Sequence, residues 1–338
     1  MLWKSESMIG PDPIVSANLY ADGQLDSALV QVVGRFRRHL YKSGEESFVW
    51  AMRYGRRGEH LKIRVHGPAF RESELFRQLS KFAAVWLSKL PAQDLVQPRR
   101  LMLFSPPVDQ DDIGHEEVAD RQFLRTGYRR HPVSLGAEKL LANDEYVAGI
   151  VNCLGAGTDF ILESLGLDNE GRLNQRQVQL LLLKAVVLAT SALESLDLRL
   201  GYLVYHRDWM FRSRLKLAGL EREEKCKTLL ERVCSSANSL KADHLAKLED
   251  FALNMWDGGM AQNYPLAEML KILCFQMKGM QSFDPFAADY RFGLIFKVLH
   301  NLGNVLGLNR ISEALVYHVL YRIFDSNPPN VSLIPREN

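Results

Sequence analysis

The sequence predicts an α+β protein in which an N-terminal ferredoxin-like antiparallel sheet with helices is followed by a large, mainly helical region. Three observations predict this class. Short strand-like runs alternate with amphipathic helical runs up to about residue 105. Nearly everything after residue 134 has helical periodicity. The later helical runs are separated by glycine or proline, and no repeat of fixed length is present.

The N-terminal elements follow the order β-α-β-β-α-β. The connection Arg56-Arg57-Gly58 is short and contains glycine, which is typical of a hairpin between the two middle strands. Because this order is that of the ferredoxin-like fold, we expect both helices on one face of the sheet. The expected strands cover 15–21, 48–55, 60–67 and 100–105, and the expected helices cover 25–40 and 72–90.

Prolines and acidic residues follow the last expected strand and indicate a solvated connector. Pro106 and Pro107 precede an acidic run at 109–117. The chain is therefore divided into a ferredoxin-like part at 1–110, a loop connector at 111–133 and a helical part at 134–338, with the two folded parts forming one continuous catalytic unit. Within the helical part, helices are expected at 144–165, 174–195 and about 205–217, 219–236, 240–256, 264–281, 289–306 and 310–324.

Composition and charge exclude several classes of protein. Of 338 residues, 47% are hydrophobic and 24% charged, which is ordinary for a folded domain. Lys+Arg 42 against Asp+Glu 40 gives a net charge of +2 and no general reason to bind nucleic acid. The four cysteines include no CxxC pair, and neither a signal peptide nor a membrane-spanning apolar run is visible. We therefore expect a cytoplasmic protein with reduced thiols and no membrane contact.

Common catalytic and cofactor motifs are missing from the sequence. GxGxxG, the phosphate-binding GxxxxGK motif, HExxH, GxSxG and the EF-hand loop do not occur. His60 and His66 fall on one face of a strand, but two histidines alone do not make a metal site. The sequence therefore predicts neither a metal nor a cofactor.

Four groups of residues remain as candidate sites. In the strand at 60–67, alternation places His60, Lys62, Arg64 and His66 on one face, where they could meet a carboxylate or simply face water. The other three groups each have a simpler structural explanation. In the order given next, these are a basic surface loop, an internal ion pair and a buried core histidine. These groups are Tyr128-Arg129-Arg130-His131, then Tyr205-His206-Arg207-Asp208-Trp209, in which Asp208 could orient Arg207 or His206, and His300 with Asn304 one helical turn later.

Three segments resemble one known family. The segment FVWAMRYGRRGEHLKIRVHG at 48–67 resembles the "F-x-RY…G-x-HLR-x-R" segment of the C-terminal elimination domain of class I lanthipeptide dehydratases. Residues 299–308, with Glu313 following, are similar to that domain's closing "LHM-x-x-NR-x-G…E" helix. Residues 137–144 are similar to its central "AE-x-x-F…DS" segment, so the resemblance spans about Trp3 to Phe324 in islands.

This resemblance implies a role in the biosynthesis of ribosomally synthesised, post-translationally modified peptides such as thiopeptides and lanthipeptides. Some standalone members of the family expel glutamate from glutamylated Ser or Thr and leave dehydroalanine or dehydrobutyrine. Related pyridine synthases join two dehydroalanines in a formal 4+2 aza-cycloaddition and then expel water and the leader peptide. The expected partners are a precursor peptide, with leader and modified core, and a separate glutamylating dehydratase subunit. Direct tRNA binding is not expected, because the chain has no counterpart of the glutamylation domain.

The resemblance also implies roles for single residues. Arg53 or Arg64 matches the first family arginine, which would hold the glutamyl carboxylate, and His300 matches the family histidine, which would transfer a proton. Arg129 or Arg130 stands at the second family arginine, although TGYRRH replaces the family's E-x-x-RYGG. The predicted catalytic residues are His300, Arg53, Arg64 and Arg130, and the predicted substrate-binding residues are His60, Lys62, Tyr128, Arg129, Arg207 and Asn304.

Three functions stay open at this point. His300 and the arginines favour glutamate elimination by a lyase. The changed E-x-x-RYGG motif favours pyridine formation, and Val305 is a further departure, in place of the arginine of the family's NR pair. The third function is a non-catalytic subunit that binds the leader peptide, in which an edge of the sheet would receive an extended peptide by strand addition.

Overall fold

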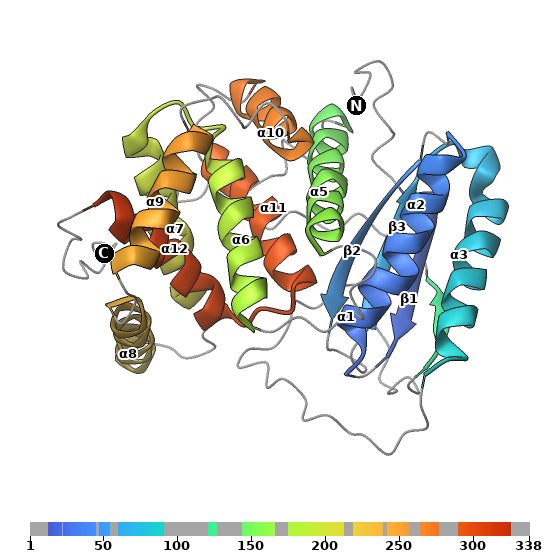
Figure 1. Ribbon diagram of the computed structural model, residues 1–338, viewed down its shortest axis with the longest axis horizontal. Coiled ribbons are helices and arrows are strands. Elements are labelled where there is room, and N and C mark those ends of the chain that lie inside the picture. Colours follow the sequence, from blue (N-terminus) through green and yellow to red (C-terminus); the bar gives the residue numbers. More distant parts are fainter. Residues whose placement is uncertain are drawn as a thin grey trace.

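A small sheet with its helices lies beside a group of longer helices, and helix α5 stands between the two (Figure 1). The structure is a computed structural model that describes residues 13–21, 23–44, 47–54, 60–90, 121–126, 144–165, 175–212, 219–238, 242–256, 264–276 and 290–325. Among these residues, no helix is both long and apolar enough to cross a membrane.

The sheet has four strands in the order β2-β3-β1-β4. Strand β1 pairs antiparallel with both β3 and β4, and β2 pairs antiparallel with β3. This is the strand order of a ferredoxin-like arrangement, and the predicted α+β class is confirmed. The strands are β1 (Val15–Tyr20), β2 (Phe48–Tyr54), β3 (His60–His66) and β4 (Phe123–Arg125).

The fourth strand of the described sheet lies later in the chain than the strand expected from the sequence. It was expected at 100–105, which lies outside the described residues, whereas β4 occupies 123–125 inside the segment interpreted as a loop connector. Three residues are too few to show an alternating pattern, so this strand has no local signal in the sequence. Pairing with β1 defines the strand instead, through Tyr20 N–H to the Gln122 carbonyl at 2.8 Å and Thr126 N–H to the Ser16 carbonyl at 2.9 Å.

Helical segments cover the apolar face of the sheet. The helix expected at 25–40 is present as α1 (Leu25–Ala28), a π-helical stretch at Leu29–Gly34 and α2 (Arg35–Lys42). The short 3-10 turn Ala69–Arg71 leads into α3 (Glu72–Leu87). Figure 1 shows α1, α2 and α3 on the same side of the strands. The sheet side chains beneath them are fully buried and apolar: Val15, Ala17, Leu19, Val49, Ala51, Leu61, Ile63 and Val65.

The rest of the described chain is helical, as predicted, with one difference in boundaries. The helix expected at 174–195 ends at Thr190, and the helix expected from about 205 begins at Leu196. Ser195 explains the earlier start, because its hydroxyl accepts a hydrogen bond from the Leu198 N–H at 3.2 Å and caps the new helix. The helices are α5 (Asp144–Leu165), α6 (Gln175–Thr190), α7 (Leu196–Arg212), α8 (Gly219–Asn238), α9 (Ala242–Trp256), α10 (Pro265–Gln276), α11 (Tyr290–Val305) and α12 (Arg310–Phe324).

Strand β2 is where the sheet meets the helices, because α5 and α11 both pack against it. Arg53 of β2 donates from Nε to the Val305 carbonyl at the end of α11, at 2.5 Å, and pairs with Asp26 of α1. A cation suits a helix C-terminus, where the last carbonyls have no partner within the helix. Arg53 therefore fixes the end of α11 against the sheet.

Candidate active site

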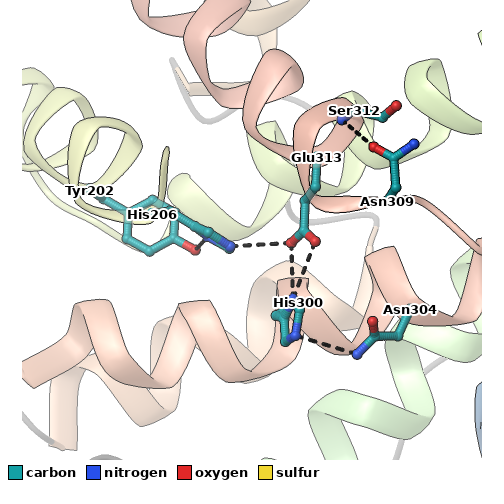
Figure 2. A network of polar contacts seen from close by, with 7 residues as sticks. All are labelled: Tyr202, His206, His300, Asn304, Asn309, Ser312 and Glu313. Carbon is teal, nitrogen blue, oxygen red and sulfur yellow. Dashed lines mark hydrogen bonds and ion pairs between the residues drawn. The ribbon is translucent and has the colours of Figure 1, made fainter. Parts of the chain in front are cut away.

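A short turn between α11 and α12 brings a histidine and a glutamate together. Gly307 adopts φ +68°, a left-handed conformation that suits glycine at a helix end. Asn309 then caps α12, its side-chain oxygen accepting the Ser312 N–H at 2.9 Å (Figure 2). Glu313 follows in the first turn of α12, where the helix dipole favours a negative charge. It faces His300 of α11.

Five side chains form a continuous polar network, called the His–Glu cluster below (Figure 2). Nδ1 of His300 lies 3.2 Å from Oε2 of Glu313, and Nε2 of His206 lies 3.2 Å from Oε1 of the same carboxylate. Behind His206, the Tyr202 hydroxyl lies 2.6 Å from Nδ1. On the opposite side, Nδ2 of Asn304 lies 3.5 Å from Nε2 of His300. The cluster thus joins α7, α11 and α12.

Exposure in the cluster changes from its inner to its outer end. Glu313 is 1% exposed and His206 is 0% exposed, whereas the side chain of His300 is 12% exposed. Only the His300 end is therefore placed to meet a substrate, while the other groups support it from the interior.

The buried glutamate is ionised although it lies in the core. Burial by itself raises the pKa of Glu313, but the charge of His300 and the hydrogen bonds from His206 and His300 outweigh it and lower the pKa to about 2. Burial lowers the pKa of His206 to about 4, so this ring is neutral near pH 7. Burial raises the pKa of Tyr202, which keeps its phenol protonated.

These protonation states fix the direction of each hydrogen bond. The Glu313 carboxylate can only accept, so Nε2 of His206 and Nδ1 of His300 both donate to it. Nδ1 of neutral His206 must then accept from the Tyr202 hydroxyl. A neutral His300 ring has its one proton on Nδ1, so its Nε2 carries none. The Asn304 amide is placed to donate to this Nε2. Nε2 of His300 is thus the atom able to take up a proton.

Aromatic rings hold the two histidines from the sides. The ring of Phe296 stacks on His300 with centroids 5.4 Å apart and an angle of 19°, and it also lies 4.4 Å from His206. Trp209 lies 4.1 Å from Phe296 and 6.1 Å from His300. Such packing restricts both rings and excludes water from the inner part of the cluster.

The basic face predicted on β3 exists, but it does not face water. His60, Lys62, Arg64 and His66 are each between 0% and 2% exposed, so the alternative of a simply solvated face is wrong. Arg64 donates to the Ser16 hydroxyl of β1, and Nε2 of His66 accepts from the Trp50 indole at 3.1 Å. The role of this face in binding a substrate stays a prediction.

Arg207 lies next to His206 in the sequence but belongs to a different network. Its Nε donates to Asp208 at 2.8 Å and its Nη1 to Nδ1 of His318 at 3.1 Å. This is the internal ion pair that the sequence offered as the simpler alternative. Tyr128, Arg129 and Arg130 lie outside the described residues.

Of the predicted site residues, the structure brings together His300 and Asn304. Glu313 was noted only as part of a motif, His206 only as a member of the group at 205–209, and Tyr202 was not predicted. Their signal is a tyrosine and a histidine four residues apart on one helix, which by itself fits any buried helix face. Among the described residues, no three His, Cys, Asp or Glu side chains are grouped so as to hold a metal ion.

Comparisons with known proteins identify a family from the sequence and similar folds among solved structures. The family described as lantibiotic biosynthesis dehydratase, C-terminal, matches residues 15–324. A search among curated proteins finds no match. The pyridine synthase TbtD from thiomuracin biosynthesis is structurally similar, with a TM-score of 0.61 and 14% identity over 91% of this chain and 96% of TbtD. TsrL is similar with a TM-score of 0.54 and 12% identity over 92% of this chain and 94% of its own. The tRNA-dependent lantibiotic dehydratase MibB from Microbispora sp. 107891 aligns with a TM-score of 0.48 and 10% identity, over 95% of this chain and 28% of MibB.

Proposed function

Because the chain belongs to the lantibiotic biosynthesis dehydratase C-terminal family, we propose that it is a lyase acting on a ribosomally made precursor peptide. The proposed reaction expels glutamate from glutamylated Ser or Thr and leaves dehydroalanine or dehydrobutyrine. The observation that carries the proposal is the contact of His300 Nδ1 with the buried Glu313 carboxylate at 3.2 Å, which leaves Nε2 as a base.

In this reaction His300 takes the Cα proton of the glutamylated residue on Nε2. The electron pair of the Cα–H bond becomes the Cα=Cβ double bond, the Cβ–O bond breaks, and glutamate leaves as a carboxylate. The imidazolium that forms is stabilised by the negative charge of Glu313, which is already in place and needs no reorganisation. His300 afterwards returns its proton to water, and both charge and atoms balance.

The leaving glutamate needs a cation to hold its carboxylates. Arg53 and Arg207 already hold carboxylates of the protein itself, those of Asp26 and Asp208. Arg64 and Lys62 of β3 are at most 2% exposed, so we assign the glutamate to the remaining predicted arginines, Arg129 and Arg130. A separate glutamylating subunit would supply the substrate.

Pyridine formation is the second candidate, favoured by one observation. Arg53, expected to hold glutamate, and Arg207, expected to bind substrate, both pair with carboxylates of the protein. Pyridine formation has no glutamate to hold, because it expels water and the leader peptide. The His300–Glu313 pair would then transfer protons during the tautomerisation of an amide and the loss of water. The likeness to TbtD over nearly the whole of both chains supports this candidate through the fold alone.

The experiment is a mass measurement on defined peptides. The protein alone should release glutamate from a glutamylated precursor and leave a dehydrated product. Release of the leader from a polydehydrated peptide instead would establish pyridine formation, and binding without any mass change would establish a leader-binding subunit. His300→Ala should lower the rate by about 100-fold or more, so that glutamylated intermediate accumulates. His39→Ala, at an exposed histidine of α2, is the matched control and should leave the rate unchanged.

A further inference from the structure

A second histidine stands behind the proposed base, on the side away from solvent. His206 and His300 donate to opposite oxygens of the Glu313 carboxylate, so the glutamate is held between two rings. His206 is 0% exposed and its Nδ1 faces Tyr202, which is also 0% exposed. Neither residue can touch a peptide. Any part that they play in the reaction must act through Glu313.

The packing around His206 leaves its ring one orientation. The Tyr317 ring stacks on it with centroids 3.8 Å apart and an angle of 27°, and Phe296 covers the ring at 4.4 Å. Both ring nitrogens are used, Nδ1 by the Tyr202 hydroxyl at 2.6 Å and Nε2 by Glu313 at 3.2 Å. A hydrocarbon side chain of similar size would fill this space, so packing alone does not require a histidine here.

A buried carboxylate does require donors. An ionised glutamate in the core is costly unless its oxygens accept hydrogen bonds, and a carboxylate that loses a donor becomes more basic. With His206 in place, Oε1 of Glu313 accepts from His206 at 3.2 Å, while Nδ1 of His300 lies 3.2 Å from Oε2 and 3.4 Å from Oε1. Without His206, Oε1 would keep only the longer contact with His300, and Glu313 would compete more strongly for the proton of His300.

We propose that His206 and Tyr202 are positioning residues, which keep the Glu313 carboxylate ionised and in place so that Nδ1 of His300 stays protonated and Nε2 stays the base. The role in the reaction rests on the proposed function of His300. Tyr202 orients His206 by donating to Nδ1, which forces the proton of the neutral ring onto Nε2, toward Glu313.

The charged and titratable groups around this site come from four helices. Glu313 faces His206 and Tyr202 of α7, His300 of α11 and Tyr317 of its own helix. Tyr202 additionally faces Tyr205 of α7 and Cys274 of α10. Burial raises the pKa of the Tyr202 and Tyr317 phenols, so both stay protonated on the acid side of a pH profile.

The test compares two substitutions of His206. In His206→Gln the side-chain amide can place a donor where Nε2 lies, whereas His206→Leu fills the space without a donor. We expect the acid limb of the profile of kcat/KM against pH to move up by about one pH unit in the leucine variant and to stay near its original position in the glutamine variant. KM for the peptide should change little in either variant. Tyr202→Phe, which removes only one hydroxyl, should shift the limb in the same direction by less.

A purely structural role for His206 predicts something else. The leucine variant would then lower the amount of folded protein or kcat equally at every pH, and the glutamine variant would not restore it. An unmoved acid limb in a folded leucine variant overturns the proposal. If the leucine variant does not fold, Tyr202→Phe is used instead, and an unmoved acid limb in that variant overturns the proposal.

A readout that needs no turnover separates this inference from the proposed function. Nitrogen-15 NMR of labelled histidine, assigned with His300→Ala, reports which ring nitrogen of His300 carries the proton. We expect Nδ1 to be protonated in the unaltered protein and the two nitrogens to average in His206→Leu. Identical His300 signals in both proteins overturn the positioning role. An inactive protein with the expected signals would instead contradict the proposed lyase activity and leave the positioning role supported.

Discussion

Nδ1 of His300 lies 3.2 Å from Oε2 of Glu313, and this contact joins the end of α11 to the start of α12. The two residues are 13 positions apart, and the turn at 306–309 folds one helix back so that the imidazole meets the carboxylate. A carboxylate behind an imidazole selects the tautomer and stabilises the imidazolium, which is the arrangement that a general base needs. The consequences of this contact can be measured.

Glu313→Gln keeps the size of the side chain and removes its charge. The amide can no longer stabilise a protonated His300, so we expect kcat to fall by about 100-fold or more with little change in KM. Steady-state kinetics on the dehydration substrate, at a pH where the unaltered protein is most active, measures this. Glu268→Gln, at an exposed glutamate of α10, is the control and should retain full activity. An unaltered kcat in Glu313→Gln would remove the glutamate from the mechanism.

Gly303 has no side chain, and this leaves room for the carboxylate of Glu313. A Cβ built on Gly303 would lie 3.0 Å from the carboxyl carbon and Oε2 of Glu313, which is closer than ordinary contact. Gly303→Ala should therefore displace the carboxylate from His300 and lower kcat by about tenfold or more, although alanine is the better helix former by about 1 kcal/mol.

Gly201 of α7 provides the matched control for that substitution. A Cβ there would lie 3.5 Å from the nearest atom of Phe292, an ordinary contact. Gly201→Ala should keep full activity and raise the free energy of unfolding by up to about 1 kcal/mol. Equal activity in the two alanine variants would show that the carboxylate can shift without consequence.

The sequence predicted those parts of the fold that have a local pattern. Alternation placed His60, Lys62, Arg64 and His66 on one face of β3, and helical spacing placed His300 beside Asn304. Burial of the basic face could not be predicted in this way, because it depends on what packs over the sheet. The three-residue strand β4 and the contact of His206 with Glu313 are products of tertiary pairing between distant segments, and neither leaves a local signal.

Arg53 was predicted to hold the substrate, whereas in the structure it bonds to other parts of the protein. Its side chain is 9% exposed and pairs with Asp26, which is 18% exposed, while Nε holds the Val305 carbonyl. Arg53→Gln and Asp26→Asn should each lower the free energy of unfolding by about 2 kcal/mol, and the double variant should lose much less than the sum. Urea unfolding of the three variants measures this coupling. If Arg53 instead holds the substrate, Arg53→Gln would raise KM for the glutamylated peptide and Asp26→Asn would not.

An exposed pair supplies the control for this cycle. Arg125 and Glu72 form an ion pair in which both side chains are almost half exposed, at 49% and 45%. Removing either charge should change the free energy of unfolding by no more than about 0.5 kcal/mol, because water and salt screen such pairs. A coupling energy for Arg53 and Asp26 as small as that of the exposed pair would contradict the role of Arg53 as a link between sheet and helices.

Acid should destabilise the protein through buried histidines before it affects most carboxylates. Burial, together with the nearby charges of Arg207 and Arg322, lowers the pKa of His318 from its ordinary 6.5 to about 4. Between these two values the unfolded chain binds a proton that the folded protein does not, so stability that is fully present above pH 6.5 is lost as pH falls toward 4. His318→Asn keeps an acceptor for Arg207 but cannot be protonated, so its free energy of unfolding should fall less steeply than that of the unaltered protein between pH 6.5 and 4.

Urea unfolding across this range measures both slopes, with His39→Asn at the exposed histidine of α2 as the control that should follow the unaltered protein. Parallel curves for His318→Asn and the unaltered protein would mean that His318 is protonated in the fold at its ordinary pKa, and that its contact with Arg207 is not the 3.1 Å acceptor bond found between these two residues.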